Sequence, residues 1–493
     1  MTEREWVVSC WPDSALTGRR KILTDKKTIT RDNVVDVVSK ALAIHRLNRG
    51  EIQYLYDFYR GRQDIRNKVK QVRPEINNKV TVNRANEIVT FKTAYFLSEP
   101  IQYVSNGGET DVSDKVKRLN DFMIAEDKVS VDKEILDWMH ICGVGVRMVT
   151  PDEEVEENGS PLLIYSLDPR EAFVIYYSGL GQKPLAGVIR QKDEDGQWFS
   201  CVYTTSFYCE IKGDKITEYK ERSVPYIPII EYVNNDARLG AFEIVIPLLN
   251  AINNIESNRL DDVEQFVNSI LVFENCEITR EQIAQLLENL GLMIKSNGTD
   301  KASVYRVDGE LSQAGAQTLV DDMYDTVLTI TGMPNRNGGS STSDTGRATI
   351  FRDGWQNAES RAEDTNKTFE RSERQFLKVA LYICNALVEN FNLNVSDIKI
   401  EHNPNNLSNM QSRMQILCEG LNNEKIHPKI PWIISGMPNA EEYYKISMEY
   451  CEQTQAELNK TLEEELRNDR HSESVSNSGQ GNSVIEQESN QEV

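Results

Sequence analysis

The sequence predicts an α+β protein that is mainly helical. Apolar residues recur three or four positions apart before residue 104 and again after residue 240, which is the period of an amphipathic helix. Between residues 160 and 232 the period changes to two, which is typical of strands. The chain has 493 residues. That is about three times the usual domain length, so about two to four hydrophobic cores are expected and a single small module is excluded.

The balance of charges limits the classes of partner. Lysine and arginine number 55 and aspartate and glutamate 77, so the net formal charge is −22 and the sequence pI is near 4.9. A domain that reads DNA sequence is normally basic, because it releases counterions from phosphates. The acidic balance therefore argues against a sequence-reading DNA binder. It does not exclude a protein that lets DNA pass without holding it.

Composition points to a soluble globular protein. Hydrophobic residues make up 39% of the chain and charged residues 27%. No run approaches the eighteen or so apolar residues that cross a bilayer. The first residues, MTEREWVVSC, lack the charged-then-apolar order of a secretory signal. We therefore expect a cytosolic protein with no membrane partner.

The cysteines and histidines indicate no metal centre and no cofactor. Eight cysteines are scattered without a CxxC pair or a Cys/His cluster at zinc spacing, and the five histidines are dispersed. We expect reduced cysteines buried in the core. They are Cys10, Cys142, Cys201, Cys209, Cys276, Cys384, Cys418 and Cys451.

The first 240 residues divide into an arm, a helical part and a meander. Residues 1–45 form an expected N-terminal arm with a basic cluster, read either as solvated or as a docking strip for an acidic neighbour; the cluster is Arg19, Arg20, Lys21, Lys26, Lys27 and Arg31. Helices follow, one ending at Gly61 and one at Pro100. The stretch at 160–232 is an antiparallel meander. The glycines at 143–145 are interpreted as the opening of a strand or a close backbone approach.

Residues 240–332 predict two helices joined by a compact insertion. The first helix, about 28 residues or roughly 40 Å long, contains Pro247, which either starts or kinks it. The second helix covers residues 312–332. The insertion at 268–311 contains short extended pieces, ILVFE, GLMIKS and ASVYRV, and a short helix.

The remainder of the chain predicts a loop and further helices. Residues 333–347 contain three glycines, three serines and two threonines, so we expect a flexible exposed loop. A helix of about 45 residues follows, roughly 70 Å if unbroken, with Gly354 as a weak breaker and a first half that is polar on every side. Residues 406–470 predict a smaller helical group. Residues 471–493 have four acidic residues and no basic or aromatic ones, so disorder is expected.

No catalytic motif stands out. The sequence has no GxxxxGK[ST] phosphate loop, HExxH, GxSxG or EF-hand pattern. Carboxylate pairs such as Asp261/Asp262 and Asp321/Asp322 are poor metal sites, because adjacent side chains point to different faces of a helix. We therefore expect no enzyme. The alternatives are a nucleic-acid-processing enzyme or ATPase subunit of a packaging complex, and a scaffold that binds proteins only.

An ordered set of strings resembles the portal proteins of tailed bacteriophages, in the siphophage-type branch. The resemblance covers about residues 45–470, and the order of the strings is more specific than any one of them. The strings are LYDFYRGRQDI, NNKVTVNRANEIVTFKTAYFLSEPI, HICGVGVRMV followed by IYSLDPREAFVIY, GAFEIVIPLLNAINNIESNRLDDVEQFVNSILVFE, and SSTSDTGRATIF.

The resemblance implies a portal fold assembled as a closed ring, usually a dodecamer, around a channel at one capsid vertex of the virion. Double-stranded DNA would be packaged and ejected through it without sequence specificity. Implied partners are the terminase large subunit, the head-to-tail adaptor, and the major capsid and scaffolding proteins, with assembly in the host cytoplasm. The implied parts are the wing at 46–239 and 348–405, stem helices at 240–267 and 312–332, a clip at 268–311, a tunnel loop at 333–347 and a crown at 406–470.

The charges suggest how the implied channel treats DNA. Residues 240–332 carry 15 acidic and 5 basic residues, a net charge of −10, whereas residues 333–347 carry +1. A wall that repels phosphate would prevent tight, salt-dependent adhesion. A loop of glycine, serine and threonine would offer weak contacts that do not read bases. The sequence therefore predicts a low-friction conduit with a flexible collar.

Three sets of residues carry these roles. The DNA-proximal loop residues are Asn335, Arg336, Asn337, Gly338, Gly339, Ser340, Ser341, Thr342, Ser343, Asp344 and Arg347. The acidic candidates for the channel lining are Asp261, Asp262, Glu264, Asp321, Asp322 and Asp325. The candidates for docking the adaptor and the motor are Glu274, Glu277, Arg280, Glu281, Lys295, Lys301 and Arg306.

Overall fold

The computed structural model of the chain divides into two compact units, residues 1–405 and 406–493, and each is considered by itself. The structure describes residues 18–71, 73–106, 110–152, 159–267, 270–274, 279, 303–307, 313–335, 354–402, 409–423, 425–435 and 440–476.

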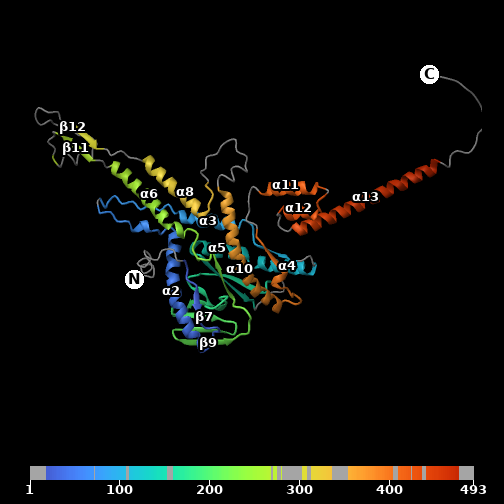
Figure 1. The fold of residues 1–493 in the computed structure, drawn as a ribbon, viewed down its shortest axis with the longest axis horizontal. Coiled ribbons are helices and arrows are strands. Elements are labelled where there is room, and N and C mark those ends of the chain that lie inside the picture. The colour runs from blue at the N-terminus through green and yellow to red at the C-terminus, as the bar shows by residue number, and fades with distance from the viewer. Residues whose placement is uncertain are drawn as a thin grey trace, which may run out of the picture. The chain divides into compact units, whose positions relative to one another are not determined.

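The first unit mixes helices and strands, as the sequence predicts (Figure 1). Its helices are α2 (Val34–Tyr59), α3 (Arg84–Phe96), α4 (Thr110–Ala125), α5 (Lys128–Cys142), α6 (Ile246–Val267), α8 (Gln313–Thr331) and α10 (Trp355–Leu387). Short 3-10 helices lie at Asp64–Asn67, Glu243–Val245 and Val395–Asp397. Its strands are β1 (Ile22–Thr24), β2 (Gln102–Ser105), β3 (Val144–Pro151), β4 (Leu162–Leu167), β5 (Ala172–Tyr177), β6 (Pro184–Lys192), β7 (Trp198–Tyr203), β8 (Phe207–Lys212), β9 (Lys215–Glu221), β10 (Ile229–Val233), β11 (Ile270–Glu274), β12 (Ser303–Val307) and β13 (Ile398–Glu401).

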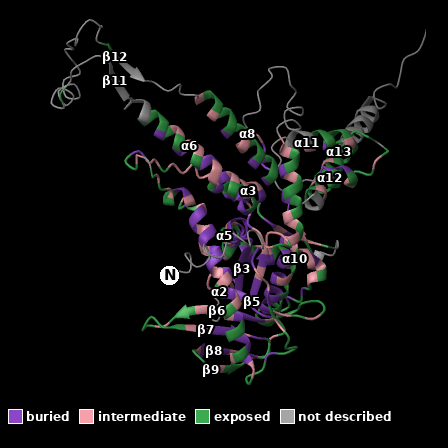
Figure 2. Ribbon diagram, turned by 60° about the vertical axis from the view of Figure 1, so that its left-hand side comes forward, coloured by how far each residue is buried: buried purple, intermediate pink, exposed green. Residues whose placement is uncertain are grey.

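Five strands of the predicted meander, β5 to β9, are confirmed as consecutive antiparallel neighbours in a six-stranded sheet of order β1-β5-β6-β7-β8-β9, in which β1 pairs in parallel with β5. The first predicted piece, PLLIYSLDP, contains β4, which belongs to a different sheet. The period of two places alternate side chains on opposite faces. On β5, Phe173 and Ile175 pack in one core with residues of α2, whereas Ala172 and Val174 pack in another with residues of β3 and β10. The sheet is therefore covered on both faces at β5, which Figure 2 shows as buried, whereas the edge strand β9 has no buried residue.

A second sheet, in the order β10-β3-β4, lies between the large sheet and the helices α5 and α10. The glycine interpretation is confirmed where β3 begins. Gly143 ends α5 at φ +84°, and a Cβ there would lie 2.2 Å from the backbone oxygen of Arg238. Only glycine fits such a position without moving the neighbouring backbone.

A buried charge network ties α10 to this layer. Arg147 on β3 donates to Glu373 on α10 at 3.0 Å and also pairs with Asp132 on α5. Lys128 of α5 bridges both carboxylates, at 2.5 Å from Asp132 and 2.8 Å from Glu373. Arg147 and Glu373 have no exposed side-chain area. Two cations and two carboxylates therefore balance each other inside the core.

Two tyrosines complete the network. Tyr103 of β2 and Tyr232 of β10 donate their hydroxyls to the two oxygens of Glu373, at 2.5 and 2.7 Å. Burial raises the pKa of both phenols well above the ordinary value, and the charge of Glu373 raises it further, so both stay protonated. Burial alone would raise the pKa of Glu373, but Lys128, Arg147 and the Tyr103 hydroxyl lower it to about 2. The carboxylate is therefore ionised near neutral pH.

Helix α10 starts at Trp355, directly after Gly354 at φ +80°, and has 33 residues, or about 50 Å. The left-handed backbone at Gly354 interrupts the helical path at that point. Residues 348–353, where the predicted helix begins, lie outside the described residues. The first half is not polar on every side in its packing, since Ala358, Ala362 and Phe369 are buried.

The expectation of a solvated basic cluster is wrong for Arg19, whereas Lys26, Lys27 and Arg31 are exposed as that reading expects. Arg19 is 2% exposed and pairs with Glu51 of α2 at 3.2 Å and with Glu243 at 2.5 Å. Its backbone N–H donates to the Arg238 carbonyl, and Ile22–Thr24 join the large sheet as β1. The acidic partners of Arg19 and Arg20 therefore lie within the chain itself.

The second unit is helical, with α11 (Asn409–Leu421), α12 (Lys429–Ile434) and α13 (Ala440–Ser476), in which α12 packs against both α11 and α13. Helix α13 includes residues 471–476, so the disorder expected from residue 471 is wrong there, and residues 477–493 lie outside the described part. Cys418 and Cys451 are exposed, which corrects the expectation of a buried site, because both lie on helix faces that the described residues leave uncovered. Cys142, Cys201, Cys209 and Cys384 are buried as expected, and Cys10 and Cys276 lie outside the described residues.

Removing the charge of Glu373 tests the network. The substitution Glu373→Gln leaves two buried cations facing one carboxylate, so we expect the free energy of opening of β3 and β10 to fall by about 3–5 kcal/mol. Hydrogen exchange of peptides from these strands measures it. The matched control is Glu370→Gln on the same helix, where the carboxylate is partly exposed and lies 3.6 Å from Arg374, so its effect should stay below about 1 kcal/mol. Equal exchange in the two variants would show that the network does not hold the layer.

Candidate functional site

The two long helices predicted at 240–332 form an antiparallel pair. Helix α6 has 22 residues, fewer than predicted, because a 3-10 turn at Glu243–Val245 precedes it. Pro247 is its second residue, so the proline starts the helix and does not kink it. In Figures 1 and 2, α6 and α8 lie side by side, and they contact each other along their length.

The base of the pair is anchored in a hydrophobic core that also includes α2 and α3. Leu249 and Ile252 of α6 pack in this core with Val327 and Leu328 of α8. Farther along, Arg259 of α6 donates to Gln313 and Gln317 of α8, each at 2.9 Å. The pair is therefore fixed to the body at one end and cross-linked by polar contacts beyond it.

A ladder of polar side chains on α6 binds a neighbouring segment of backbone. Asn253, Ser257 and Asp261 follow at intervals of four residues, so they lie on one face of the helix. They accept the backbone N–H groups of Val82 at 2.9 Å, Val80 at 2.9 Å and Asn78 at 2.6 Å, respectively.

The two periods match. Four helical residues advance about 6 Å and two extended residues about 6.6 Å, so each side chain meets every second amide. Asn253 and Ser257 are not among the candidate residues predicted from the sequence. Their four-residue spacing with Asp261 places the three side chains on one face of the helix, and this spacing is the signal that was available.

Asp261 differs from the other acidic candidates. Its side chain has no exposed area and pairs with Lys68 at 2.9 Å and also with Lys70. Burial alone would raise its pKa, but hydrogen bonds from Lys70, from the backbone and side chain of Asn78 and from Lys68 hold the pKa well below the ordinary value. In this chain Asp261 therefore fastens the segment around residues 68–78, and its charge does not face solvent.

The other five acidic candidates are exposed on the α6–α8 pair, and among the described residues none forms an ion pair. Three accept hydrogen bonds from side-chain amides: Asp321 from Gln317 at 2.7 Å, Asp325 from Asn335 at 3.0 Å, and Glu264 from Asn78 at 3.1 Å. The exposed set is Asp262, Glu264, Asp321, Asp322 and Asp325. Their negative charge is thus not neutralised within the described chain.

Apolar side chains are also exposed along the same helices. Leu260 and Val263 of α6 and Leu319 and Ile330 of α8 are each more than a third exposed. Such residues on an amphipathic helix pack when a further surface covers them. The described part of the chain supplies no such cover.

The predicted loop begins where α8 ends. Gly332, at φ +71°, follows the helix, and a Cβ there would lie 2.7 Å from Cγ of Arg361. Asn335 is the last residue described before Gly354. The other loop candidates lie outside the described residues: Arg336, Asn337, Gly338, Gly339, Ser340, Ser341, Thr342, Ser343, Asp344 and Arg347.

The insertion between the helices contains one described strand pair. Strands β11 and β12 are antiparallel, with Glu274 opposite Ser303 and Arg306 opposite Leu271, so the ILVFE piece pairs with SVYRV. The candidates Glu277, Arg280, Glu281, Lys295 and Lys301 lie outside the described residues, as do GLMIKS and the predicted short helix.

Two features that define classes of protein, a metal-binding cluster and a membrane-spanning helix, are absent from the described residues. No group of three or more His, Cys, Asp or Glu side chains is placed to hold a metal ion among them. Within the same residues, no helix combines the length and apolar character that a membrane crossing needs.

Comparison with known proteins identifies the family. The family described as phage portal protein, SPP1 Gp6-like, matches residues 39–465. The chain belongs to this family of portal proteins. The resemblance seen in the sequence over residues 45–470 is thereby confirmed.

One solved structure is similar at low identity. It is described as the neck of an empty GTA particle computed with C6 symmetry, and it matches at 10% sequence identity and a TM-score of 0.42, covering 72% of this chain and 90% of that chain. No protein of curated function matches the chain.

Substitutions at Asp261 and Asp262 test whether the buried and the exposed acid of α6 have different roles in this portal protein. Because Asp261 accepts from the Asn78 amide and from two lysines, Asp261→Asn should lower the free energy that holds residues 77–82 on α6 by about 1–3 kcal/mol. Hydrogen exchange of that peptide reports the change. Asp262→Asn, next to it and exposed, is the control and should leave the exchange unaltered. Faster exchange in both variants, or in neither, would contradict the structural role of Asp261.

Proposed function

We propose that this portal protein forms a homo-oligomeric ring at one vertex of the phage capsid. Double-stranded DNA would enter and leave through the ring axis without sequence-specific contacts. The family match over residues 39–465 is the observation that carries this proposal. The usual member of such a family is a dodecamer, and we propose the same number here.

The exposed apolar residues support a ring of copies. Leu260, Val263, Leu319 and Ile330 remain uncovered on two helices whose bases are well packed. In a ring, the flank of each helix pair would lie against the next copy and bury these side chains. The hydrophobic contribution of that burial would favour closure.

The exposed acids support a channel wall that repels DNA. Asp262, Asp321, Asp322 and Asp325 have no ion-pair partner among the described residues, in a region with a net charge of −10. Phosphates that pass such a wall would not be neutralised, so the DNA would not adhere to it. The channel would then act as a low-friction conduit.

The segment between α8 and α10 is proposed as the tunnel loop. Its glycine, serine and threonine residues offer hydroxyl and amide groups and carry only Arg336 and Arg347 against Asp344 up to residue 347. Such groups contact phosphates and sugars without reading bases. The loop would therefore form a collar around the DNA.

The remaining parts are proposed to serve assembly. The insertion that contains β11 and β12 would be the clip, which docks the terminase motor during packaging and the head-to-tail adaptor afterwards. The large sheet with α2, α5 and α10 would be the wing, facing capsid and scaffolding proteins, the α6–α8 pair the stem, and residues 406–470 the crown. The protein would act mechanically, with no covalent chemistry. No described feature favours the alternative of a nucleic-acid-processing enzyme or an ATPase subunit.

The ring is tested by the mass of the purified protein. We expect multi-angle light scattering to give a mass about twelve times that of the 56.3 kDa chain, and images to show closed rings with a central hole. Diluting the sample controls for loose association, because a closed ring persists. A monomer that persists at high concentration would refute the proposal.

The collar is tested by shortening the loop. Deleting residues 336–345 should leave rings intact but reduce the DNA retained in particles, because the collar contacts are lost. Retained DNA in purified particles is the measurement. The control deletes an equal length at the acidic end of the chain, residues 484–493. Particles with normal DNA content from the loop deletion would disprove the role.

A further inference from the structure

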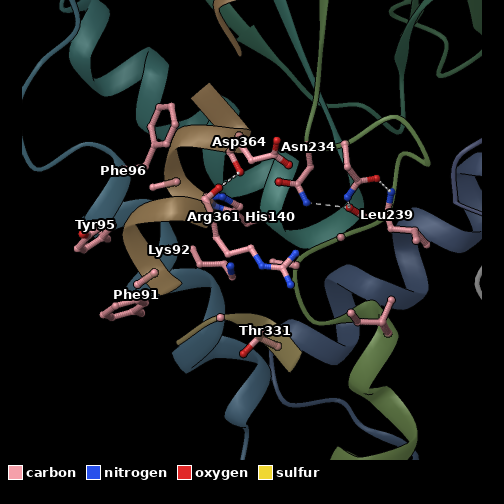
Figure 3. A pocket seen from close by; sticks show the side chains of 18 of the residues that line it. Phe91, Lys92, Tyr95, Phe96, His140, Asn234, Leu239, Thr331, Arg361 and Asp364 are labelled. Atoms are coloured by element: carbon pink, nitrogen blue, oxygen red, sulfur yellow. Dashed lines mark hydrogen bonds between the residues drawn. The ribbon is translucent and has the colours of Figure 1, made fainter. Parts of the chain in front are cut away.

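A pocket of about 180 Å³ lies in the first unit between α3, α10, the end of α8 and the turn at 234–241. Figure 3 shows its lining side chains. None of the loop, channel or docking candidates named above is among them. Of the lining residues, the proposed function uses only Ile330, which would lie against the next copy.

Two cationic side chains share this pocket. Lys92 reaches it from α3 and Arg361 from α10, and Figure 3 draws both heads pointing into the same space. Neither head has an ion pair or a side-chain hydrogen bond with any described residue. Burial, and then the charge of Arg361, lower the pKa of Lys92 to about 8. No carboxylate offsets either effect.

The other titratable groups in the lining do not neutralise this charge. Burial, and then the charge of Lys92, lower the pKa of His140 to about 3, so its ring is neutral and is bonded to the hydroxyl of Thr93 at 3.0 Å. Burial raises the pKa of Tyr95 to about 12. Asp364 is the one acid in the lining, and it lies 4.0 Å from Lys367 and apart from the two cationic heads in Figure 3.

The neutral polar groups leave the centre of the pocket to the cations. The side-chain amides of Asn234 and Asn235 both donate to the carbonyl of Leu239, at 2.9 and 3.0 Å. Lys92 is half-buried and Arg361 is exposed, and their charges repel each other, so binding of an anion to both is favoured. Arginine presents paired N–H donors that match two oxygens of a phosphate, and lysine adds a point charge.

We propose that Lys92 and Arg361 form a binding site for a phosphate group. Doubly charged inorganic phosphate matches the two cations better than a single carboxylate does, and the volume holds one such group. The backbone of DNA offers the same phosphate oxygens, with one negative charge on each phosphodiester. The site does not depend on the ring or on the channel.

The location of the pocket gives the ligand a structural effect. Arg361 packs over Gly332, the first residue after α8, and Lys92 belongs to α3. A phosphate held by both cations would join α3 to the first turns of α10, beside the point where the chain leaves α8. Binding would thus fix both ends of the segment between residues 332 and 354.

Calorimetric titration of the full-length protein with sodium phosphate at constant ionic strength tests the site. We expect saturable binding to the wild type. The variants Lys92→Met and Arg361→Gln should each bind about tenfold more weakly or less, because each loses a charge-assisted contact. The conservative Lys92→Arg, which keeps the charge, should retain binding. The control Arg374→Gln removes an exposed arginine of the same helix outside the pocket and should bind like the wild type.

The source of the phosphate is resolved by competition with a short DNA duplex. If the duplex displaces phosphate from the wild type, the DNA backbone is a ligand; if it does not, the site takes the free anion. The proposal is overturned if phosphate does not saturate the wild type, or if Lys92→Met and Arg361→Gln bind it as the control does. Loss of oligomer mass in these variants without phosphate binding to the wild type would overturn it too, in favour of a carboxylate from a second copy.

Discussion

The buried contact between Arg147 and Glu373 is the constraint on which the first unit depends. A guanidinium and a carboxylate with no exposed area are costly to remove from water, and the cost is met only where the geometry is complete. Lys128, Asp132, Tyr103 and Tyr232 complete it, and each comes from α5, β2 or β10. One cluster thereby fixes how α10 lies against α5, strand β2 and the sheet β10-β3-β4. The α6–α8 pair packs on the same unit, through a core that it shares with α2 and α3.

Local patterns predicted much of the fold. The alternation in β8, where Phe207, Cys209 and Ile211 are buried, is visible in the sequence and gives the strand directly. The paired helices at 240–332 follow equally from apolar spacing. The sequence did not predict which residue forms an ion pair with each charged side chain. In the sequence Arg19 cannot be told from a solvated arginine, because its partners Glu51 and Glu243 are distant along the chain and reach it only in the fold.

In the candidate site, too, local patterns could be predicted from the sequence, but contacts between distant segments could not. The sequence identified six acids, and the rule that adjacent helical side chains diverge was correct for Asp261 and Asp262, since one is buried and the other exposed. It did not indicate which of the two is buried, because that depends on Lys68 and Lys70 from a distant segment. Nor did any motif mark Lys92 and Arg361, whose relation arises only when α3 and α10 pack together. Single cations in a sequence carry no signal of a shared pocket.

The ladder on α6 has an evolutionary consequence. Asn253, Ser257 and Asp261 hold their neighbour through main-chain amides, so these three bonds do not depend on the side chains at 78, 80 and 82, although the Asn78 side chain also donates to Asp261 and Glu264. Proline is the exception, because it has no N–H to give. Substitution at positions 78, 80 and 82 would therefore keep these backbone hydrogen bonds with every residue type except proline.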